Sequence, residues 1–367
     1  MSKNTIINVT KSSMPSFEEY CEEIKDLWRT RWLTNHGIKL QTLEEELKKY
    51  LGVRNVVLYA NGHLALEAAI SYFNFPAGSE IITTPFTFVS TTNAIIRCGM
   101  TPVFCDISGK DATIDIKKME ALISSKTVAI IPVHVYGNVC DVEAIKSVAD
   151  KYNLKVIYDA AHAFGVKYKD TGIANYGDIS MFSFHSTKVF HTIEGGCLCF
   201  DDDSMKTLLE QQKDFGIVDT ENCNYAGGNA KMNEFQASMG LCNLRHIDEY
   251  IFARKIAVEH YRDRLSGVDG IKLFDCQKDA LSNYAYFPII FDGYKKNRDD
   301  IKDELAKHGI GARKYFYPIT NEYLYTNNKY KGVTPIAKSI SEKILTLPLS
   351  SELSIEDIDL ICDLILK

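Results

Sequence analysis

The 367-residue sequence lacks any apolar run that approaches the roughly 20 residues of a membrane-spanning helix. Its first residues, Met-Ser-Lys-Asn-Thr-Ile-Ile-Asn, lack the apolar core of a secretory signal peptide. The ten cysteines include no CxxC pair, and several lie in apolar runs, which is typical of buried thiols in a reducing compartment. These absences predict a cytoplasmic protein without a membrane partner.

The sequence also lacks an excess of positive charge. Lysine and arginine number 42 against 48 acidic residues, for a net charge of -6 at pH 7. A nucleic-acid-binding protein would need a basic face, so this mild acidity argues against that class. An anionic ligand would need a locally positive pocket, because the field of the whole molecule does not attract it.

Several functional motifs are missing. Neither G-x-G-x-x-G nor G-x-x-x-x-G-K-[ST] occurs, which speaks against a dinucleotide-binding fold and a P-loop enzyme. No group of cysteine, histidine or acidic residues has the spacing of metal ligands, so we expect no metal site.

What remains is an ordinary globular composition, with 46% hydrophobic and 25% charged residues. A single core usually stops growing near roughly 250–300 residues, so this length favours two domains. We expect a large domain over residues 1–248, which begins with an N-terminal arm, and a smaller α/β domain over residues 249–367.

Strand-like and helix-like patterns alternate along most of the chain. This alternation predicts an α/β fold with a mostly parallel sheet between helices. The expected strands of the large domain cover residues 53–59, 81–84, 102–107, 128–135, 156–158, 179–183 and 196–200. Expected helices cover residues 17–28, 42–51, 87–96, 141–152, 233–265 and 297–308, and Ser354 is the expected N-cap of a terminal helix.

Ligands of parallel sheets bind outside the carboxyl ends of the strands. Polar, aromatic or small residues follow five successive expected strands. Their convergence is stronger evidence for a ligand site than any single residue. The segments are Asn61-Gly62-His63, Pro85-Phe86-Thr87-Phe88, His134-Val135-Tyr136-Gly137, Asp159-Ala160-Ala161-His162 and Ser183-Phe184-His185-Ser186-Thr187-Lys188.

Asp159 and Lys188 stand out among these residues. Taken singly, Asp159 is more often a helix cap or a satisfied buried carboxylate, and a lysine is more often a solvated surface charge. Together they offer what a Schiff-base cofactor needs, because Lys188 can hold an aldehyde and Asp159 can face a protonated ring nitrogen. Ser183 and the Gly62-His63 turn are candidate phosphate contacts, since a glycine before a helix lets backbone N–H groups approach an anion. Phe88 could stack on a flat ring or pack in the core.

The chain resembles the DegT/DnrJ/EryC1/StrS sugar aminotransferases over nearly its whole length. The matching segments, besides those that hold Asp159 and Lys188, are Trp32-Leu33-Thr34-Asn35, Pro132 to Gly137, Glu194-Gly195-Gly196, Gly228 to Asn233 and Tyr317-Pro318. The resemblance implies the fold-type-I architecture, with a seven-stranded sheet, and pyridoxal 5'-phosphate (PLP) as cofactor. It also implies a homodimer with shared active sites, in which Asn229 reaches the phosphate of the partner subunit.

The resemblance assigns roles to individual residues. Lys188 and Asp159 are the catalytic pair, and Asp159 faces the pyridine nitrogen of the cofactor. His162 lies near its phenolic oxygen, Phe88 stacks on its ring, and Ser183, Gly62 and His63 bind its phosphate. Substrate contacts are expected at Trp32, Thr34, Asn35, Lys231 and Tyr317. The family's turn commonly reads Gly-Thr or Ala-Thr, so Gly62-His63 predicts a ring-nitrogen or backbone contact to the phosphate in place of a hydroxyl.

The stretch from Thr187 to Gly196 resembles the branch that acts on nucleotide-linked 4-keto-6-deoxyhexoses and makes products such as dTDP-4-amino-4,6-dideoxyglucose. The alternative is that it only shapes the cofactor turn. The expected reaction moves an amino group from L-glutamate to C4 of such a sugar, for O-antigen or lipopolysaccharide biosynthesis. A 3-keto sugar or cyclitol aminotransferase, a non-catalytic PLP-binding sensor and a cofactor-free nucleotide-sugar binding protein remain alternatives.

Overall fold

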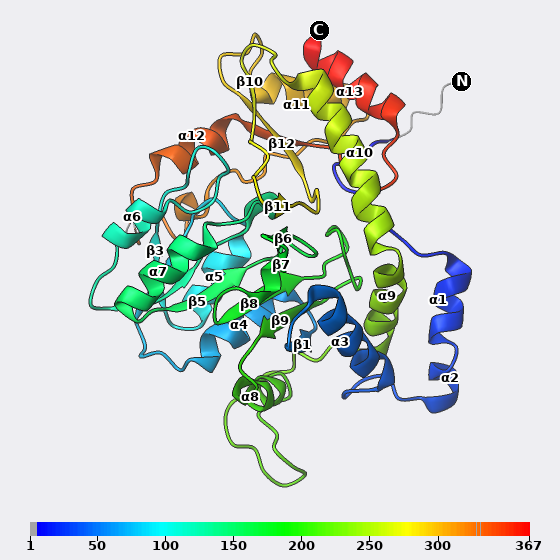
Figure 1. The fold of residues 1–367 in the computed structure, drawn as a ribbon, viewed down its shortest axis with the longest axis vertical. Helices are drawn as coiled ribbons and strands as arrows, with labels where there is room; N and C mark the ends of the chain where they lie inside the picture. Colours follow the sequence, from blue (N-terminus) through cyan, green and yellow to red (C-terminus); the bar gives the residue numbers. More distant parts are fainter. Residues whose placement is uncertain (1–5, 328, 331) are drawn as a thin grey trace.

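The computed structural model describes residues 6–327, 329–330 and 332–367, and a seven-stranded sheet lies at its centre with helices on both faces (Figure 1). The strands in spatial order are β1 (Asn55–Tyr59), β9 (Gly196–Phe200), β8 (Ile179–Ser183), β5 (Lys155–Asp159), β4 (Thr127–Ile131), β2 (Glu80–Thr83) and β3 (Thr101–Phe104). Strand β9 pairs antiparallel with β1 and β8, whereas the other pairs are parallel. The mostly parallel α/β sheet predicted from the sequence is confirmed.

Two hydrophobic cores cover the two faces of this sheet. One contains apolar side chains of α3 (Ile38–Leu51), α6 (Ile116–Ala121), α7 (Val142–Tyr152) and α9 (Glu234–Arg245). The other contains side chains of α4 (Gly62–Tyr72), α5 (Val89–Arg97) and α8 (Ser204–Gln212). Because both faces are covered, every residue of β1 and β9 is buried, which explains why these strands read as continuous apolar runs.

A smaller antiparallel sheet forms the upper part of the molecule in Figure 1. It consists of β10 (Ile271–Leu273), β12 (Phe287–Phe291) and β13 (Ile344–Leu347). Side chains of α10 (Ile247–Leu265), α11 (Arg298–Lys307) and α13 (Ile355–Leu366) share its core, while α12 (Pro335–Lys343) contacts β12. A third small sheet joins β11 (Ala280–Leu281) to β6 (Lys167–Tyr168) and β7 (Thr171–Gly172). Strands β6 and β7 lie in the connection between β5 and β8, so a strand of the C-terminal part pairs with a connection of the large sheet.

The single helix expected from Asn233 to Leu265 is wrong, because the chain leaves helical geometry at His246 (φ -109°, ψ 3°). Helix α9 ends at Arg245 and packs against α3, whereas α10 begins at Ile247 and packs against α13. The two helices therefore belong to different packing surfaces. The domain boundary at residue 248 stays a prediction, and it falls two residues after this break.

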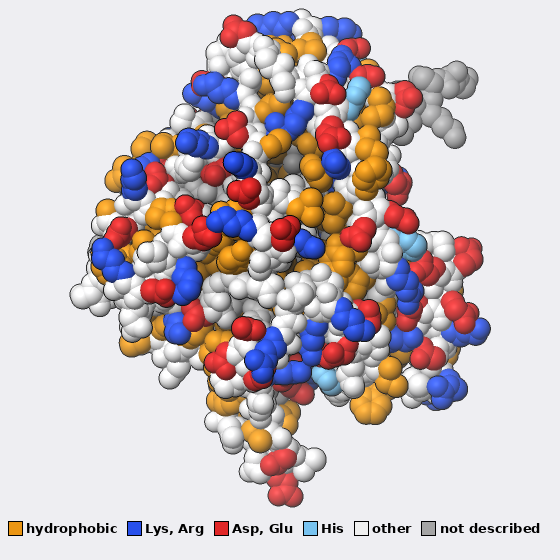
Figure 2. All heavy atoms as spheres, viewed as in Figure 1, with side chains coloured by type: hydrophobic (Ala, Val, Ile, Leu, Met, Phe, Trp, Pro, Cys, Tyr) orange, Lys and Arg blue, Asp and Glu red, His pale blue; other side chains and the backbone are white. Residues whose placement is uncertain are grey.

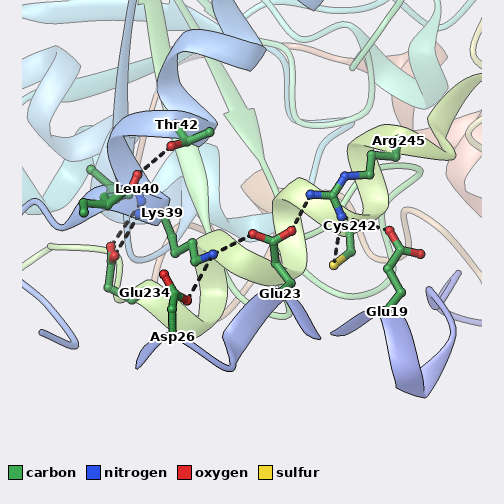
Figure 3. Close-up of polar contacts among 10 residues, drawn as sticks. Glu19, Glu23, Asp26, Lys39, Leu40, Thr42, Glu234, Cys242 and Arg245 are labelled. Atoms are coloured by element: carbon green, nitrogen blue, oxygen red, sulfur yellow. Dashed lines mark hydrogen bonds and ion pairs between the residues drawn. The ribbon is translucent and has the colours of Figure 1, made fainter. Parts of the chain in front are cut away.

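Two other expected boundaries are corrected by the structure. The strand expected over residues 128–135 ends at Ile131, because Pro132 has no N–H to donate and residues Val135–Gly137 form a 3₁₀ turn. The helix expected over residues 42–51 begins earlier, at Ile38. Its first N–H groups, those of Lys39 and Leu40, donate to the buried Glu234 carboxylate (2.8 and 3.1 Å; Figure 3). This cap comes from a residue distant in sequence, so local patterns could not reveal it.

Ion pairs fasten the first helices to the body of the molecule. Glu23 on α1 (Phe17–Ile24) pairs with Lys39 (2.9 Å) and with Arg245 on α9, as Figure 3 shows. Asp26, just before α2 (Leu27–Thr30), pairs with the same Lys39 at 3.2 Å. The segment before α3 is thereby held against α9.

Acidic and basic side chains are interspersed on the face shown in Figure 2, with no broad basic region. None of the helices in the described ranges is both long and apolar enough to cross a membrane.

Candidate active site

A cavity of about 380 Å³ opens where β5 and β8 end and where α4 and α5 begin. We call it the strand-end cavity. Its wall includes the predicted residues Gly62, His63, Phe88, Asp159, His162, Ser183 and Lys188. Residues far apart in the sequence therefore meet at the expected edge of the sheet.

Asp159 is the last residue of β5 and is only 4% exposed. Its Oδ2 accepts a hydrogen bond from Thr91 Oγ1 at 2.7 Å, and its Oδ1 accepts one from the Ala161 N–H at 3.1 Å. Burial raises the pKa of Asp159, while these two hydrogen bonds and the charge of Lys188 act in the opposite direction. In the described chain no cation forms an ion pair with this carboxylate, so it suits a ligand that brings its own positive charge.

His162 supplies a neutral hydrogen-bond donor to the same cavity. Its Nδ1 accepts the backbone N–H of Tyr136 at 3.0 Å, which assigns the proton of the neutral ring to Nε2. Burial, followed by the positive charges of Lys188 and Arg313, holds the pKa of His162 well below its usual value. The ring therefore stays uncharged and can donate to an anionic oxygen without becoming a cation.

Lys188 lies in the turn after β8, where its N–H donates to the His185 carbonyl at 2.9 Å. Its Nζ is 6.0 Å from the centre of the Tyr286 ring, which belongs to the C-terminal part of the chain. Within the described residues no carboxylate lies within ion-pair distance of Nζ, so the amine is available to a ligand in the cavity.

The start of α4 forms a cradle for an anion. The Asn61 side chain accepts the Leu64 N–H (2.9 Å) and caps the helix, whose positive dipole end faces the cavity. A Cβ at Gly62 would lie 3.0 Å from Ser183 Cβ, so glycine is what allows this close approach. Backbone N–H groups and the Ser183 hydroxyl are thus brought together, as a phosphate requires.

The His63 ring is already engaged within the chain. Its Nδ1 lies 2.8 Å from Ser90 Oγ, and its Nε2 lies 3.0 Å from Glu67 Oε1. The backbone N–H therefore remains as the contact that this residue itself can offer to a phosphate.

Arg313 and Ser90 also line the cavity and were missed by the sequence reasoning. The Arg313 guanidinium lies 4.1 Å from the centre of the Tyr315 ring, and its side chain has no carboxylate partner in the described part of the chain. It reaches the cavity because its backbone pairs with Thr346. The local sequence around Arg313 does not indicate this pairing. Ser90, in contrast, lies two residues after Phe88 at the start of α5, so its position in the sequence could have indicated it.

Five other predicted residues, Trp32, Thr34, Asn35, Asn229 and Lys231, lie outside the strand-end cavity. They belong to two segments, residues 31–37 and 213–233, which we call the outer loops. The second segment includes the loop that projects from the molecule after α8 (Figure 1). Asn35 and Lys231 line a separate cavity of about 230 Å³, and Trp32 is 60% exposed. Tyr317 also lies outside the strand-end cavity, with its ring against Arg298 and Lys314.

The sequence showed no clustered metal ligands, yet folding brings His36, Glu44 and Glu210 within reach of one another. A lysine already occupies this cluster. Lys213 Nζ lies 2.6 Å from Glu210 Oε2 and 3.9 Å from Glu44 Oε1, so a side-chain ammonium supplies the positive charge there.

Comparison with known proteins agrees with this geometry. The sequence profile of the DegT/DnrJ/EryC1/StrS aminotransferase family matches residues 16–366. The chain belongs to this family. It is 39% identical to the dTDP-4-amino-4,6-dideoxy-D-glucose transaminase of Shigella dysenteriae over 95% of both chains, and 40% identical to that of Escherichia coli over 98% of both.

Solved structures share the fold. DesI, solved in the presence of its TDP-sugar product, superposes with a TM-score of 0.93 at 27% identity, over 98% of this chain and 92% of DesI. The PLP-form of Spr1654 from Streptococcus pneumoniae gives 0.91 at 26% identity, over 98% of this chain and 97% of that one. The chain is therefore a fold-type-I transaminase with PLP as its cofactor.

Proposed function

We propose that this enzyme transfers an amino group from L-glutamate to C4 of a nucleotide-linked 4-keto-6-deoxyhexose, with dTDP as the nucleotide. The observation that carries the proposal is the strand-end cavity, which is lined both by the buried Asp159 carboxylate and by Lys188, whose amine pairs with no carboxylate of the described chain. The choice of sugar is supported by two relatives that are 39% and 40% identical and are transaminases for dTDP-4-amino-4,6-dideoxy-D-glucose.

The residues present fit PLP. The Asp159 carboxylate, which has no cationic partner among the described residues, would face the ring nitrogen, while the neutral Nε2–H of His162 would donate to the phenolic oxygen. The start of α4 and Ser183 would hold the phosphate, and Phe88, which is 48% exposed at the cavity, would cover the ring. PLP, when bound, withdraws electrons from the α-carbon of the substrate and stabilises the negative charge that develops there.

Proton transfer falls to Lys188. Lys188 lines the cavity, and its Nζ has no ion-pair partner in the described chain. His185, one of the lining histidines, lies 3.5 Å from Glu194. The Lys188 amine, when free, can take a proton from the donor's α-carbon and return one to the product.

Arg313 is the lining cation that remains once Lys188 serves the cofactor. It lies over the Tyr315 ring (4.1 Å), whose centre is 5.9 Å from that of the His162 ring, so it is on the His162 side of the cavity. A guanidinium can bind a carboxylate through two parallel hydrogen bonds, and we assign Arg313 to the α-carboxylate of L-glutamate.

The outer loops support a homodimer with shared active sites. Asn229 and Lys231 do not face the cavity of their own chain. Phe215, Ile217 and Val218 in the projecting loop are each more than 40% exposed, which suits burial against a second copy. A mixture of Lys188→Ala and Asn229→Ala chains tests this arrangement, because mixed dimers would regain one intact site and random mixing would restore about a quarter of wild-type activity. No activity above that of either variant alone would contradict shared sites.

We place the enzyme in the cytoplasm, in the synthesis of an amino sugar for a surface glycan such as the O-antigen of lipopolysaccharide. The decisive first experiment is the visible spectrum of the PLP-loaded protein before and after addition of L-glutamate, followed by NMR of the product formed from dTDP-4-keto-6-deoxyglucose. We expect the yellow absorbance to shift to shorter wavelength and the amino group to appear at C4. An unchanged spectrum would indicate a PLP-binding sensor, and turnover with 3-keto sugars or cyclitols alone would redirect the assignment.

A further inference from the structure

A chain of polar side chains runs along one side of the strand-end cavity. Ser90 Oγ on α5 lies 2.8 Å from His63 Nδ1 on α4, and His63 Nε2 lies 3.0 Å from Glu67 Oε1 one helical turn on. Arg97 on α5 donates to the same carboxylate oxygen through its Nε. Ser90 and His63 line the cavity beside Gly62 and Ser183, so the chain of contacts ends at the proposed phosphate cradle.

The chemistry of these groups decides where the protons lie. A carboxylate can only accept hydrogen bonds, so the contact with Glu67 assigns a proton to His63 Nε2. If His63 is neutral, Nδ1 accepts the Ser90 hydroxyl and the serine oxygen presents lone pairs to the cavity. If His63 is protonated, Nδ1–H donates to Ser90 Oγ and the serine O–H is free to donate into the cavity.

An anion in the cradle favours the second arrangement. A phosphate accepts hydrogen bonds from O–H donors, and the imidazolium ion adds a positive charge nearby. The Glu67 carboxylate balances this charge from behind and is itself paired with Arg97. The other charged or titratable groups that line the cavity are Asp159, His162, His185, Lys188, Glu194, Arg313 and Tyr315.

We propose that Ser90 is a phosphate-binding hydroxyl of the cofactor site and that His63 is the positioning residue that turns its O–H toward the phosphate, with Glu67 holding His63. This inference rests on the proposed function. It explains how a chain with histidine at position 63, where the family's turn commonly carries threonine, still offers a second hydroxyl to the cavity that Ser183 lines.

The test compares PLP with pyridoxal, which has the same ring and aldehyde but no phosphate, in equilibrium titrations of the cofactor-free protein. Ser90→Ala should weaken PLP binding by about tenfold or more, because it removes a hydrogen bond to a charged group, and should leave pyridoxal binding unchanged. Ser71→Ala is the matched control, since Ser71 lies on α4 outside the cavity and contacts Cys98. It should alter neither affinity.

Rescue separates positioning from a merely structural effect. His63→Thr places a hydroxyl directly on the turn, so this variant should bind PLP within about threefold of wild type, and adding Ser90→Ala to it should cost little more. Glu67→Gln should weaken PLP binding by a smaller factor and provides a second variant if Ser90→Ala does not fold.

Two outcomes would overturn the inference: an unchanged ratio of PLP to pyridoxal affinity in Ser90→Ala, or an equal loss from Ser90→Ala in the wild-type and His63→Thr backgrounds. Failure of the proposed function would be seen separately. In that case the wild-type protein would not bind PLP, or its spectrum would not respond to L-glutamate.

Discussion

The strand-end cavity and the outer loops differ in how the chain builds them. Cavity residues other than Arg313 and Tyr315 sit within a few positions of a strand end or helix start, and Asp159 and His162 are 4% and 6% exposed. Trp32 in the first outer loop is 60% exposed. The outer loops are held by distant groups instead, since the Glu234 N–H donates to Leu33 O and Lys213 Nζ donates to Leu58 O. The catalytic pair lies on the sheet or in the turn that follows a strand, Asp159 at the end of β5 and Lys188 after β8, whereas groups expected to meet the sugar lie on loops.

The same difference suggests that each active site takes its cavity residues from one chain and its outer-loop residues from the partner. The cavity contains groups suited to the ring, the phosphate and the amino donor, all from one chain. The outer loops contribute nothing to it within the same chain, which is why we assign them to the partner's site. Changes in the cavity should therefore affect the donor reaction, whereas changes at the outer-loop positions expected to meet the sugar, Trp32, Thr34, Asn35 and Lys231, should affect the sugar reaction alone.

The largest effect is expected for Lys188→Ala. Loss of the amine removes both the cofactor linkage and the proton carrier, so turnover should fall by at least about a thousandfold. The yellow absorbance of PLP-loaded protein should disappear with it. Lys231→Ala in the outer loops is the control and should keep this absorbance. Steady-state turnover near that of wild type in Lys188→Ala would remove this residue from its role.

Asp159→Asn comes next. It keeps the side-chain volume but removes the negative charge opposite the ring nitrogen, and we expect turnover to fall by about a hundredfold, with weaker PLP binding. Near-normal kinetics would contradict the ring-nitrogen role.

The same substitution should have a distinct effect on the cofactor-free protein. Burial raises the pKa of Asp159, so the folded protein favours the protonated carboxyl more than the unfolded chain does. The free energy of unfolding should therefore fall as pH rises from the ordinary aspartate pKa toward the raised value, because the folded protein then loses this proton. Asp159→Asn should therefore reduce the loss of stability over this range. Urea unfolding of the wild-type and Asp159→Asn proteins between pH 4 and neutrality, roughly from the unperturbed aspartate pKa upward, measures this pH dependence of the free energy of unfolding.

Arg313→Met should act on the amino donor. Removing a guanidinium–carboxylate pair should raise the KM for L-glutamate by about tenfold to a hundredfold and leave the KM for the nucleotide sugar nearly unchanged. Lys314→Met is the matched control, because this neighbouring ammonium pairs with Asp299 at 2.6 Å. An equal rise in both KM values would mean that Arg313 does not distinguish the two substrates.

The smallest catalytic effect is expected for Gly37→Ala in the first outer loop. An added Cβ would lie 2.4 Å from Glu234 Cδ, so the cap of α3 must shift, at a cost of about 1–3 kcal/mol in the free energy of unfolding. We expect sugar turnover to fall several-fold while the spectral reaction with L-glutamate stays normal. Gly109→Ala is the control, since its Cβ would lie at an ordinary contact distance, 3.9 Å, from Ile336. A slower glutamate reaction in Gly37→Ala would break the proposed division of work.

Local patterns predicted much of this site. A buried parallel strand reads as an apolar run, and the residue after it is placed at the sheet edge by the fold itself, so Asp159, Ser183 and Lys188 could be grouped before any coordinates existed. Ser90 was missed although it lies two residues after Phe88. Its importance depends on the contact with His63, and that contact forms between two helices.

The sequence by itself determined the α/β class, the mostly parallel sheet and the cluster of functional groups at the strand ends, because strand and helix periodicities are local. Only the tertiary structure decided that α3 begins at Ile38, that the helix after Asn233 breaks at His246 and that Arg313 enters the cavity. Each of these depends on a contact between segments distant in the chain: Glu234 with Lys39, the separate packing surfaces of α9 and α10, and the pairing of Arg313 with Thr346. Such contacts follow from how helices and sheets pack together, and no local periodicity records them.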